Sequence, residues 1–110
     1  MEANVMRGAA KPTMLATFTA TSDTTVNYIE LKWTVNAPYT SQIREFEIYK
    51  SEYTQGTTPL PKEALFKIIK GTELLFLDEF PGKNKVNKYM IRAVTTEGKL
   101  SDWKTVTINY

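Results

Sequence analysis

Short segments in which apolar and polar residues alternate follow one another from Thr13 to the end of the chain. The clearest is residues 28–35, where Ile29, Leu31 and Trp33 alternate with polar or charged residues. A period of two indicates a half-buried β-strand, because successive side chains of a strand point to opposite faces. Polar or Gly/Pro clusters separate the segments, and no window supports a helix. The pattern predicts about seven strands, over residues 13–21, 28–35, 43–50, 65–70, 73–80, 88–95 and 103–110.

The alternation also predicts which side chains are buried. In the first segment it places four residues on one face, Met14, Ala16, Phe18 and Ala20, and it places Leu15 on the other. The same parity argument applied to the later segments predicts a core of large apolar and aromatic side chains. The expected core residues are Trp33, Phe46, Ile48, Tyr89 and Ile91.

The segments between the strands set the expected domain boundaries. Residues 1–12 have no sustained period and end in Lys-Pro, so we interpret them as an N-terminal tail or linker. Residues 51–64 contain two prolines and a glycine and therefore predict a long surface connection. Residues 13–110 then form one domain, an all-β antiparallel sandwich of two sheets, each with one solvated face.

The composition removes most catalytic chemistry. The chain has no Cys and no His, so disulfides, thiolate ligands, the commonest metal ligand and the usual general base are all missing. Without histidine no Ser-based triad can form. The glycines are isolated, so no phosphate-binding loop is present. We therefore expect no enzyme activity, no catalytic residues, no cofactor and no metal.

Charge and hydropathy exclude two classes of partner. Fourteen Lys and Arg against twelve Asp and Glu give a net charge of +2, too small for non-specific nucleic-acid binding. Apolar runs such as "LLFL" are too short to cross a bilayer, and the N-terminus has no apolar stretch of signal-peptide length. A starting Met on one complete sheet domain would suit a piece of a longer protein.

Three motifs, "IELKW", "FEIYKSE" and "YMIRAVTTEGKLSDW", resemble in order and spacing the fibronectin type III domain over roughly residues 13–110. Trp33 matches the buried tryptophan of the family's strand B, and Ala93-Val94 with the following polar loop matches the end of strand F. The "LSDWK" segment resembles the Ser-x-Trp-Ser element of bacterial members, with Lys104 in place of the last serine. The resemblance implies an immunoglobulin-like sandwich of fibronectin type III topology, in a bacterial secreted or surface protein.

The chain departs from the family at the corner between strands E and F. Asn87 occupies the position of the usual corner tyrosine, and an amide is expected to replace one hydrogen bond of that hydroxyl but not the packing of its ring. Asp78 matches the strand-E aspartate of the family, which favours a structural role. Glu79 should point to the opposite face, so the two carboxylates cannot act as a catalytic pair. No Arg-Gly-Asp triplet is present, which excludes integrin-type adhesion through it.

Trp103 has two open interpretations. It begins the last strand beside polar Ser101 and Asp102, so it can pack across the edge of the sandwich and stack with Arg92 or Lys104. It can also contact a neighbouring domain or a sugar. We favour packing.

Other surface residues have a binding interpretation and a simpler one. Exposed tyrosines can form a platform on which sugar rings stack, and lysines around one turn can contact phosphate or sulfate. Scattered surface tyrosines and a solvated turn are the interpretations that we favour. The residues concerned are Tyr39, Tyr49 and Tyr53, and Lys83, Lys85 and Lys88.

The leading functional hypothesis is a non-catalytic spacer or interaction module of a larger extracellular or cell-surface protein that handles glycans. Its expected partners are neighbouring domains of the parent chain, then protein or carbohydrate, and the module itself is expected to be monomeric. The alternative is a direct carbohydrate- or protein-binding module that uses the loops the family labels BC and FG. Its candidate contact residues are Tyr39, Glu97, Lys99 and Trp103.

Overall fold

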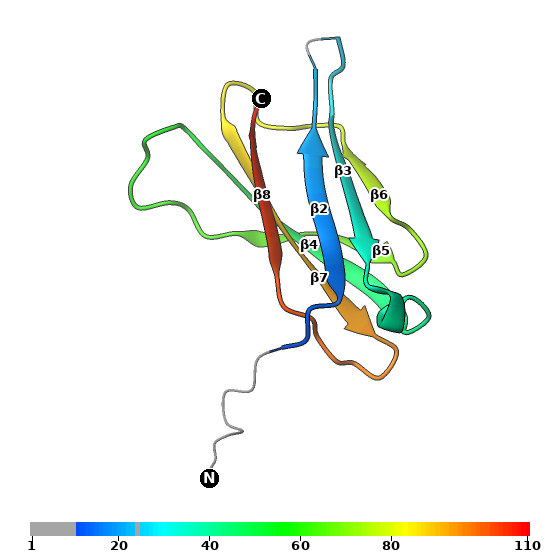
Figure 1. Ribbon diagram of the computed structural model, residues 1–110. Helices are drawn as coiled ribbons and strands as arrows, with labels where there is room; N and C mark the ends of the chain where they lie inside the picture. Colours follow the sequence, from blue (N-terminus) through cyan, green and yellow to red (C-terminus); the bar gives the residue numbers. More distant parts are fainter. Residues whose placement is uncertain (1–10, 24) are drawn as a thin grey trace.

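A computed structural model describes residues 11–23 and 25–110 as two antiparallel sheets packed face to face (Figure 1). The first sheet has the strand order β2-β3-β6, and the second has the order β5-β4-β7-β8. The strands are β2 (Leu15–Thr21), β3 (Ile29–Val35), β4 (Ile43–Tyr53), β5 (Ala64–Lys70), β6 (Leu75–Asp78), β7 (Val86–Thr95) and β8 (Lys104–Asn109). A 3₁₀ turn, η1 (Ala37–Tyr39), lies between β3 and β4.

The predicted all-β sandwich of seven strands is confirmed, but the bounds of several strands differ from the prediction, most clearly at the end of β4 and at both ends of β6. β4 continues past Lys50 to Tyr53, because its last residues pair with β7, Ser51 opposite Lys88 and Tyr53 opposite Val86. The strand after β5 is shorter than predicted. β6 pairs with β3 over four residues, from Leu75 opposite Lys32 to Asp78 opposite Ile29, the first residue of β3.

The core lies between the sheets, and all five predicted core residues are buried. Trp33 is its largest member, at 1% exposed, and it contacts Phe18 and Phe46 edge-to-face with ring centroids 6.4 and 5.4 Å apart. Such contacts stabilise beyond the burial of apolar area. The side chains of Phe46, Ile48, Tyr89 and Ile91 are likewise inaccessible to solvent.

The predicted face of the first strand was wrong at two positions. Leu15 is fully buried and Ala16 is exposed, the reverse of the expected alternation. Leu15 pairs with Val35 but Thr17 pairs with Thr34, so Ala16 is an extra residue in a β-bulge. Because a one-residue insertion shifts the parity of a strand, Leu15 reaches the core together with Phe18.

Trp33→Ala should lower the free energy of unfolding by roughly 3 to 5 kcal/mol, because it removes the aromatic centre of the core and leaves a cavity. Urea denaturation followed by far-ultraviolet circular dichroism measures this value. Thr19→Ala, at an exposed position of β2, is the control and should change stability by less than about 0.5 kcal/mol. Equal effects of the two substitutions would contradict the assignment of the core.

Candidate functional site

The loops named in the binding hypothesis lie together at one end of the sandwich. The connection 36–42 carries Tyr39, and the connection 96–103 carries Glu97, Lys99 and, at its end, Trp103. The amide of Thr96 donates to the carbonyl oxygen of Gln42 at 2.9 Å, which ties the two loops to each other. Tyr39 packs partly against the core, whereas Glu97 and Lys99 are exposed. Their role in binding stays a prediction.

A tight turn shapes the second of these loops. Gly98 has a φ of 86°, and its amide donates to the carbonyl oxygen of Thr95 at 2.9 Å. The amide of Lys99 donates to the Thr95 hydroxyl at 2.9 Å. A positive φ costs glycine little, because it has no Cβ to clash with the backbone. The turn therefore holds Glu97 and Lys99 at its tip.

Trp103 does not join that cluster. Its ring packs edge-to-face on Tyr49 with centroids 5.1 Å apart, and the Arg92 guanidinium lies 4.6 Å from its ring centre. Arg92 also donates from Nε to Glu47 at 2.8 Å, which fixes the guanidinium over the ring. This is the packing and cation stacking that we favoured for Trp103, on the outer face of the four-stranded sheet.

The three tyrosines do not form one platform. Tyr39 lies in η1, near the start of β4, while Tyr53 is the last residue of that strand. A strand of this length spans about 33 Å, which is wider than a sugar ring by several fold. Tyr49 lies between them and is engaged by Trp103. The arrangement fits scattered tyrosines rather than a stacking surface.

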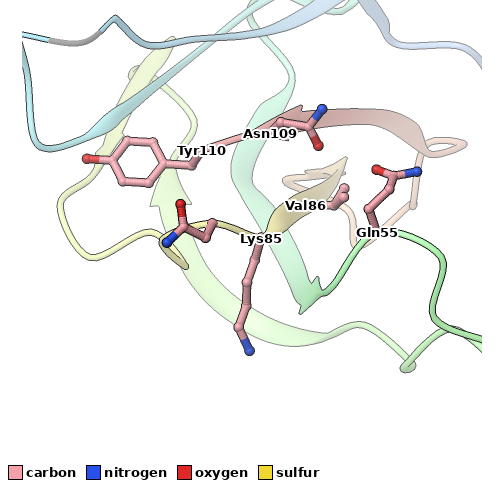
Figure 2. Close-up of a pocket in the computed structure, with 6 residues that line it drawn as sticks. Gln55, Lys85, Val86, Asn109 and Tyr110 are labelled. Carbon is pink, nitrogen blue, oxygen red and sulfur yellow. The ribbon is translucent and has the colours of Figure 1, made fainter.

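Further hollows lie at the opposite end, beside the lysine turn for which the sequence offered a phosphate or sulfate interpretation (Figure 2). One of about 330 Å³ has Tyr110 and Asn109 on its wall, with Gln55 and Lys85 beside them. A second of about 370 Å³ shares Asn109 and Tyr110 and adds polar residues such as Asp23, Asn27 and Lys83. Amide, ammonium and phenol groups can donate hydrogen bonds to a ligand. Their residues come from three separate connections and from the end of β8, so no local motif marks them.

The predicted cluster of three lysines is divided. Lys83 and Lys85 are exposed beside these hollows, whereas Lys88 binds Glu63 with 2.6 Å between Nζ and Oε2. The hydrogen bond from Lys88 lowers the pKa of Glu63 below its ordinary value. Lys88 is therefore engaged within the molecule, and the turn presents two lysines rather than three.

A buried charge network joins the two sheets. The ammonium of Lys50 on β4 lies 2.5 Å from Asp78 Oδ2 on β6 and 2.8 Å from Glu52 Oε2. The Tyr89 hydroxyl on β7 donates to the same Asp78 oxygen at 2.5 Å, and the Phe80 amide donates to Asp78 Oδ1 at 3.1 Å. The side chains of Lys50 and Asp78 are 7% and 2% exposed.

The network is structural rather than catalytic. Two carboxylates neutralise the Lys50 ammonium, so it is not a free nucleophile. Burial and the hydrogen bond to Asp78 raise the pKa of Tyr89 far above its ordinary value, so the phenol stays protonated and acts as a donor. The structural role expected for Asp78 is what this geometry supports. The sequence reasoning missed Lys50, although it shares the inward parity of Phe46 and Ile48.

Asn87 closes the corner where the family carries tyrosine. Its side chain is fully buried, and its Oδ1 accepts from the Gly82 amide at 2.8 Å. Its Nδ2 donates to the carbonyl oxygens of Gly82 at 3.0 Å and Lys85 at 3.2 Å. We expected the Asn87 amide to replace one hydrogen bond of the tyrosine hydroxyl. It makes more than one, because an amide offers the backbone both a donor and an acceptor.

Within the described residues 11–23 and 25–110, no cluster of three or more acidic side chains could hold a metal ion. The same part of the chain has no helix with the length and apolar character needed to cross a bilayer.

Neither a protein-family model nor any curated protein matches the sequence. Solved structures do match the fold. A Fn3-like protein from Clostridium thermocellum matches with a TM-score of 0.64 at 15% identity, over 92% of this chain and 95% of that one. The fold is therefore fibronectin type III-like, and the strand arrangement expected from the resemblance is confirmed.

Two enzymes contain a similar domain as a small part of a longer chain. A pectate lyase from Erwinia chrysanthemi, solved in complex with tetragalacturonic acid, matches with a TM-score of 0.57 at 14% identity, over 89% of this chain and 28% of that one. A beta-1,2-glucanase from Parabacteroides distasonis matches with a TM-score of 0.59 at 18% identity, over 93% of this chain and 13% of that one. At these identities the similarity shows the fold alone.

Asp78→Ala should lower the free energy of unfolding by about 3 to 5 kcal/mol, because it leaves the buried Lys50 ammonium without its main partner. The matched control is Glu79→Ala at the adjacent exposed position, which should change stability by less than about 0.5 kcal/mol. Thermal and urea denaturation measure both. The double variant Lys50→Met, Asp78→Leu should recover much of the loss, and a double variant as unstable as Asp78→Ala would contradict this account.

Tyr49→Ala and Trp103→Ala should each lower stability, and their effects should be coupled by about 0.5 to 1.5 kcal/mol, because the two rings contact each other. A double-mutant cycle with urea denaturation measures the coupling. The contact revises the interpretation of Tyr49 as a scattered surface tyrosine. The control cycle pairs Trp103 with Tyr53, which lies at the end of β4, and additive effects in both cycles would refute the contact.

Proposed function

We propose that this chain is a non-catalytic fibronectin type III module that serves a larger protein as a spacer or interaction domain. The single observation that carries the proposal is the coverage of the structural matches. The fold spans nearly the whole of a Fn3-like protein but only 28% and 13% of two longer enzymes. A domain of this kind accompanies catalytic domains without supplying the reaction, and fold alone assigns no activity.

The chemistry of the described residues supports the non-catalytic part of the proposal. The buried lysine is neutralised by two carboxylates, and the buried tyrosine is held protonated. In residues 11–23 and 25–110 the structure brings no nucleophile beside a free base. We infer that the domain holds no cofactor and does not bind nucleic acid or insert into a membrane.

The proposed setting is a bacterial extracellular or cell-surface protein that handles glycans. The sequence resemblance to bacterial modules supports it. The two partial structural matches add support, since one is a pectate lyase and the other a beta-1,2-glucanase. In this setting the domain is a monomer whose main contacts are neighbouring domains of its own chain.

A second function, direct binding through the BC and FG loops, is favoured by one observation. The bond from Thr96 to Gln42 joins the two loops and presents Glu97 and Lys99 on the same end as Tyr39. A rigid pair of loops can bind a ligand with little loss of conformational entropy. The contact residues Tyr39, Glu97 and Lys99 belong to this second proposal, and Trp103 is removed from it by its packing.

The isolated domain should show no retention on a glycan array that includes oligogalacturonides and β-1,2-glucans, and no hydrolysis of them, because its aromatic rings are dispersed or packed. Retention that is lost in the Glu97→Ala, Lys99→Ala double variant at an unchanged melting temperature would replace the spacer proposal with the binding one. Lys62→Ala is the control, since this exposed lysine lies outside both loops. Turnover that one point substitution abolishes would refute the non-catalytic proposal.

A further inference from the structure

The ion pair of Lys50 and Asp78 differs from the surface pairs in its burial. Their side chains are 7% and 2% exposed, and the Lys50 Nζ lies 2.5 Å from Asp78 Oδ2. Lys88 and Glu63 form a pair of similar length, 2.6 Å, but their side chains are 25% and 20% exposed. Water therefore reaches the second pair and is largely kept from the first.

A third ionisable group contacts the buried pair. Glu52, two residues along β4 from Lys50, places its Oε2 2.8 Å from the same ammonium. The Glu52 side chain is 36% exposed, so its carboxylate joins the buried pair to solvent. It also packs closely on Gly82, where an added Cβ would lie 2.5 Å from Oε1. Glu52 is therefore placed to take a proton from Lys50 and to exchange it with water.

Both oxygens of the Asp78 carboxylate accept hydrogen bonds. The Phe80 amide donates to Oδ1 at 3.1 Å, and the Tyr89 hydroxyl donates to Oδ2 at 2.5 Å. Donors aimed at a carboxyl group stabilise the negative charge that develops on its oxygens when a nucleophile attacks the carbon. The rings of Phe66 and Tyr89 lie 5.0 and 5.3 Å from the Lys50 ammonium, so the rest of the surroundings is aromatic.

The two ions are inert toward other molecules, because an ammonium has no lone pair and both groups are buried. Toward each other they are not inert. Apolar surroundings disfavour separate charges, and transfer of one proton from the Lys50 ammonium to Asp78 Oδ2 removes both charges. A neutral amine then lies beside a neutral carboxylic acid, held in contact by the fold. Groups held in this way react as if they were present at a very high concentration.

We propose that Lys50 and Asp78 condense to form an amide bond that joins the two sheets covalently. The Lys50 nitrogen attacks Asp78 Cγ, so that a carbon–nitrogen bond forms and the bond from Cγ to Oδ2 breaks. One proton already lies on Oδ2, Glu52 passes a second from the nitrogen to it, and this oxygen leaves as water. Oδ1, held by the Phe80 amide, becomes the carbonyl oxygen. An ammonium and a carboxylate thus yield one amide and one water, without an oxidant or a reductant.

The bond would close a loop of the chain between β4 and β6 and prevent the sheets from separating. A cross-link of this kind restricts the unfolded chain, as a disulfide does. The stability comparison of Asp78→Ala concerns the ion-paired form, and a chain that carries the amide would lose more stability on this substitution. The inference is independent of the proposed function, since a spacer and a binding module could both carry the bond.

The intact mass of the purified whole chain tests the proposal. After incubation to constant mass, the folded protein should weigh less than its sequence by the mass of one water molecule. Tandem mass spectrometry of a protease digest should locate the loss in a branched peptide that joins Lys50 to Asp78. The pair of Lys88 and Glu63 is the internal control. It has the same kinds of group in contact but is open to water, so it should not be joined.

Substitutions then assign the groups. Lys50→Arg keeps the positive charge without a primary amine, and its mass should equal that of its sequence. Glu52→Gln, at a partly exposed position, should slow the appearance of the bond by about a hundredfold or more, because it removes the proton carrier. The matched control Glu63→Gln makes the same change beside Lys88 and should leave the rate unchanged. Circular dichroism checks that each variant is folded.

A folded wild-type chain with the full mass of its sequence would overturn the proposal. A loss of water that persists in Lys50→Arg, or a branched peptide at other residues, would overturn it as well, because the loss would then come from other groups. An equal rate in Glu52→Gln and Glu63→Gln would refute the role of Glu52. None of these outcomes bears on the glycan and hydrolysis tests, so the proposed function fails or stands separately.

Discussion

The ion pair between Lys50 and Asp78 is the constraint on which the arrangement of the two sheets depends. Lys50 belongs to the four-stranded sheet and Asp78 to the three-stranded one, and they meet inside the sandwich at 2.5 Å. An unpaired ammonium with 7% exposure would be strongly destabilising, so Lys50 favours the arrangement of the sheets that brings Asp78 to it. The rings of Phe66 and Tyr89, 5.0 and 5.3 Å from the ammonium, surround it further.

The Asp78 carboxylate of this ion pair also fixes the position of the Tyr89 side chain on β7. Its hydroxyl donates to the Asp78 oxygen that accepts from Lys50, so one carboxylate on β6 holds groups from two other strands, β4 and β7. Asn87, two residues earlier on the same face, fixes the turn that leads into β7 by bonding to Gly82 and Lys85. The corner therefore has two anchors, an amide and a phenol, in place of the single tyrosine that the family resemblance implies.

Much of this fold could be predicted from the sequence, because strands with one buried face leave a period of two. Trp33 and its neighbours on β3 follow the pattern without exception, and so do Phe46 and Ile48 on β4. The errors have local causes. Ala16 lies in a bulge, which no periodicity reveals, and Lys50 continues an apolar face with a charged residue that hydropathy assigns to solvent.

The surfaces were harder to predict, because they depend on which strands lie at an edge. Leu65 and Ile68 read from the sequence as members of an apolar strand, and only the strand order shows that this strand has one neighbour and that both side chains face solvent. A hollow beside Phe80 likewise needs β4, β5 and the segment after β6 to come together. The apolar edge at β5 and the threonine-rich edge at β2 could therefore be told apart only once the strand order was known.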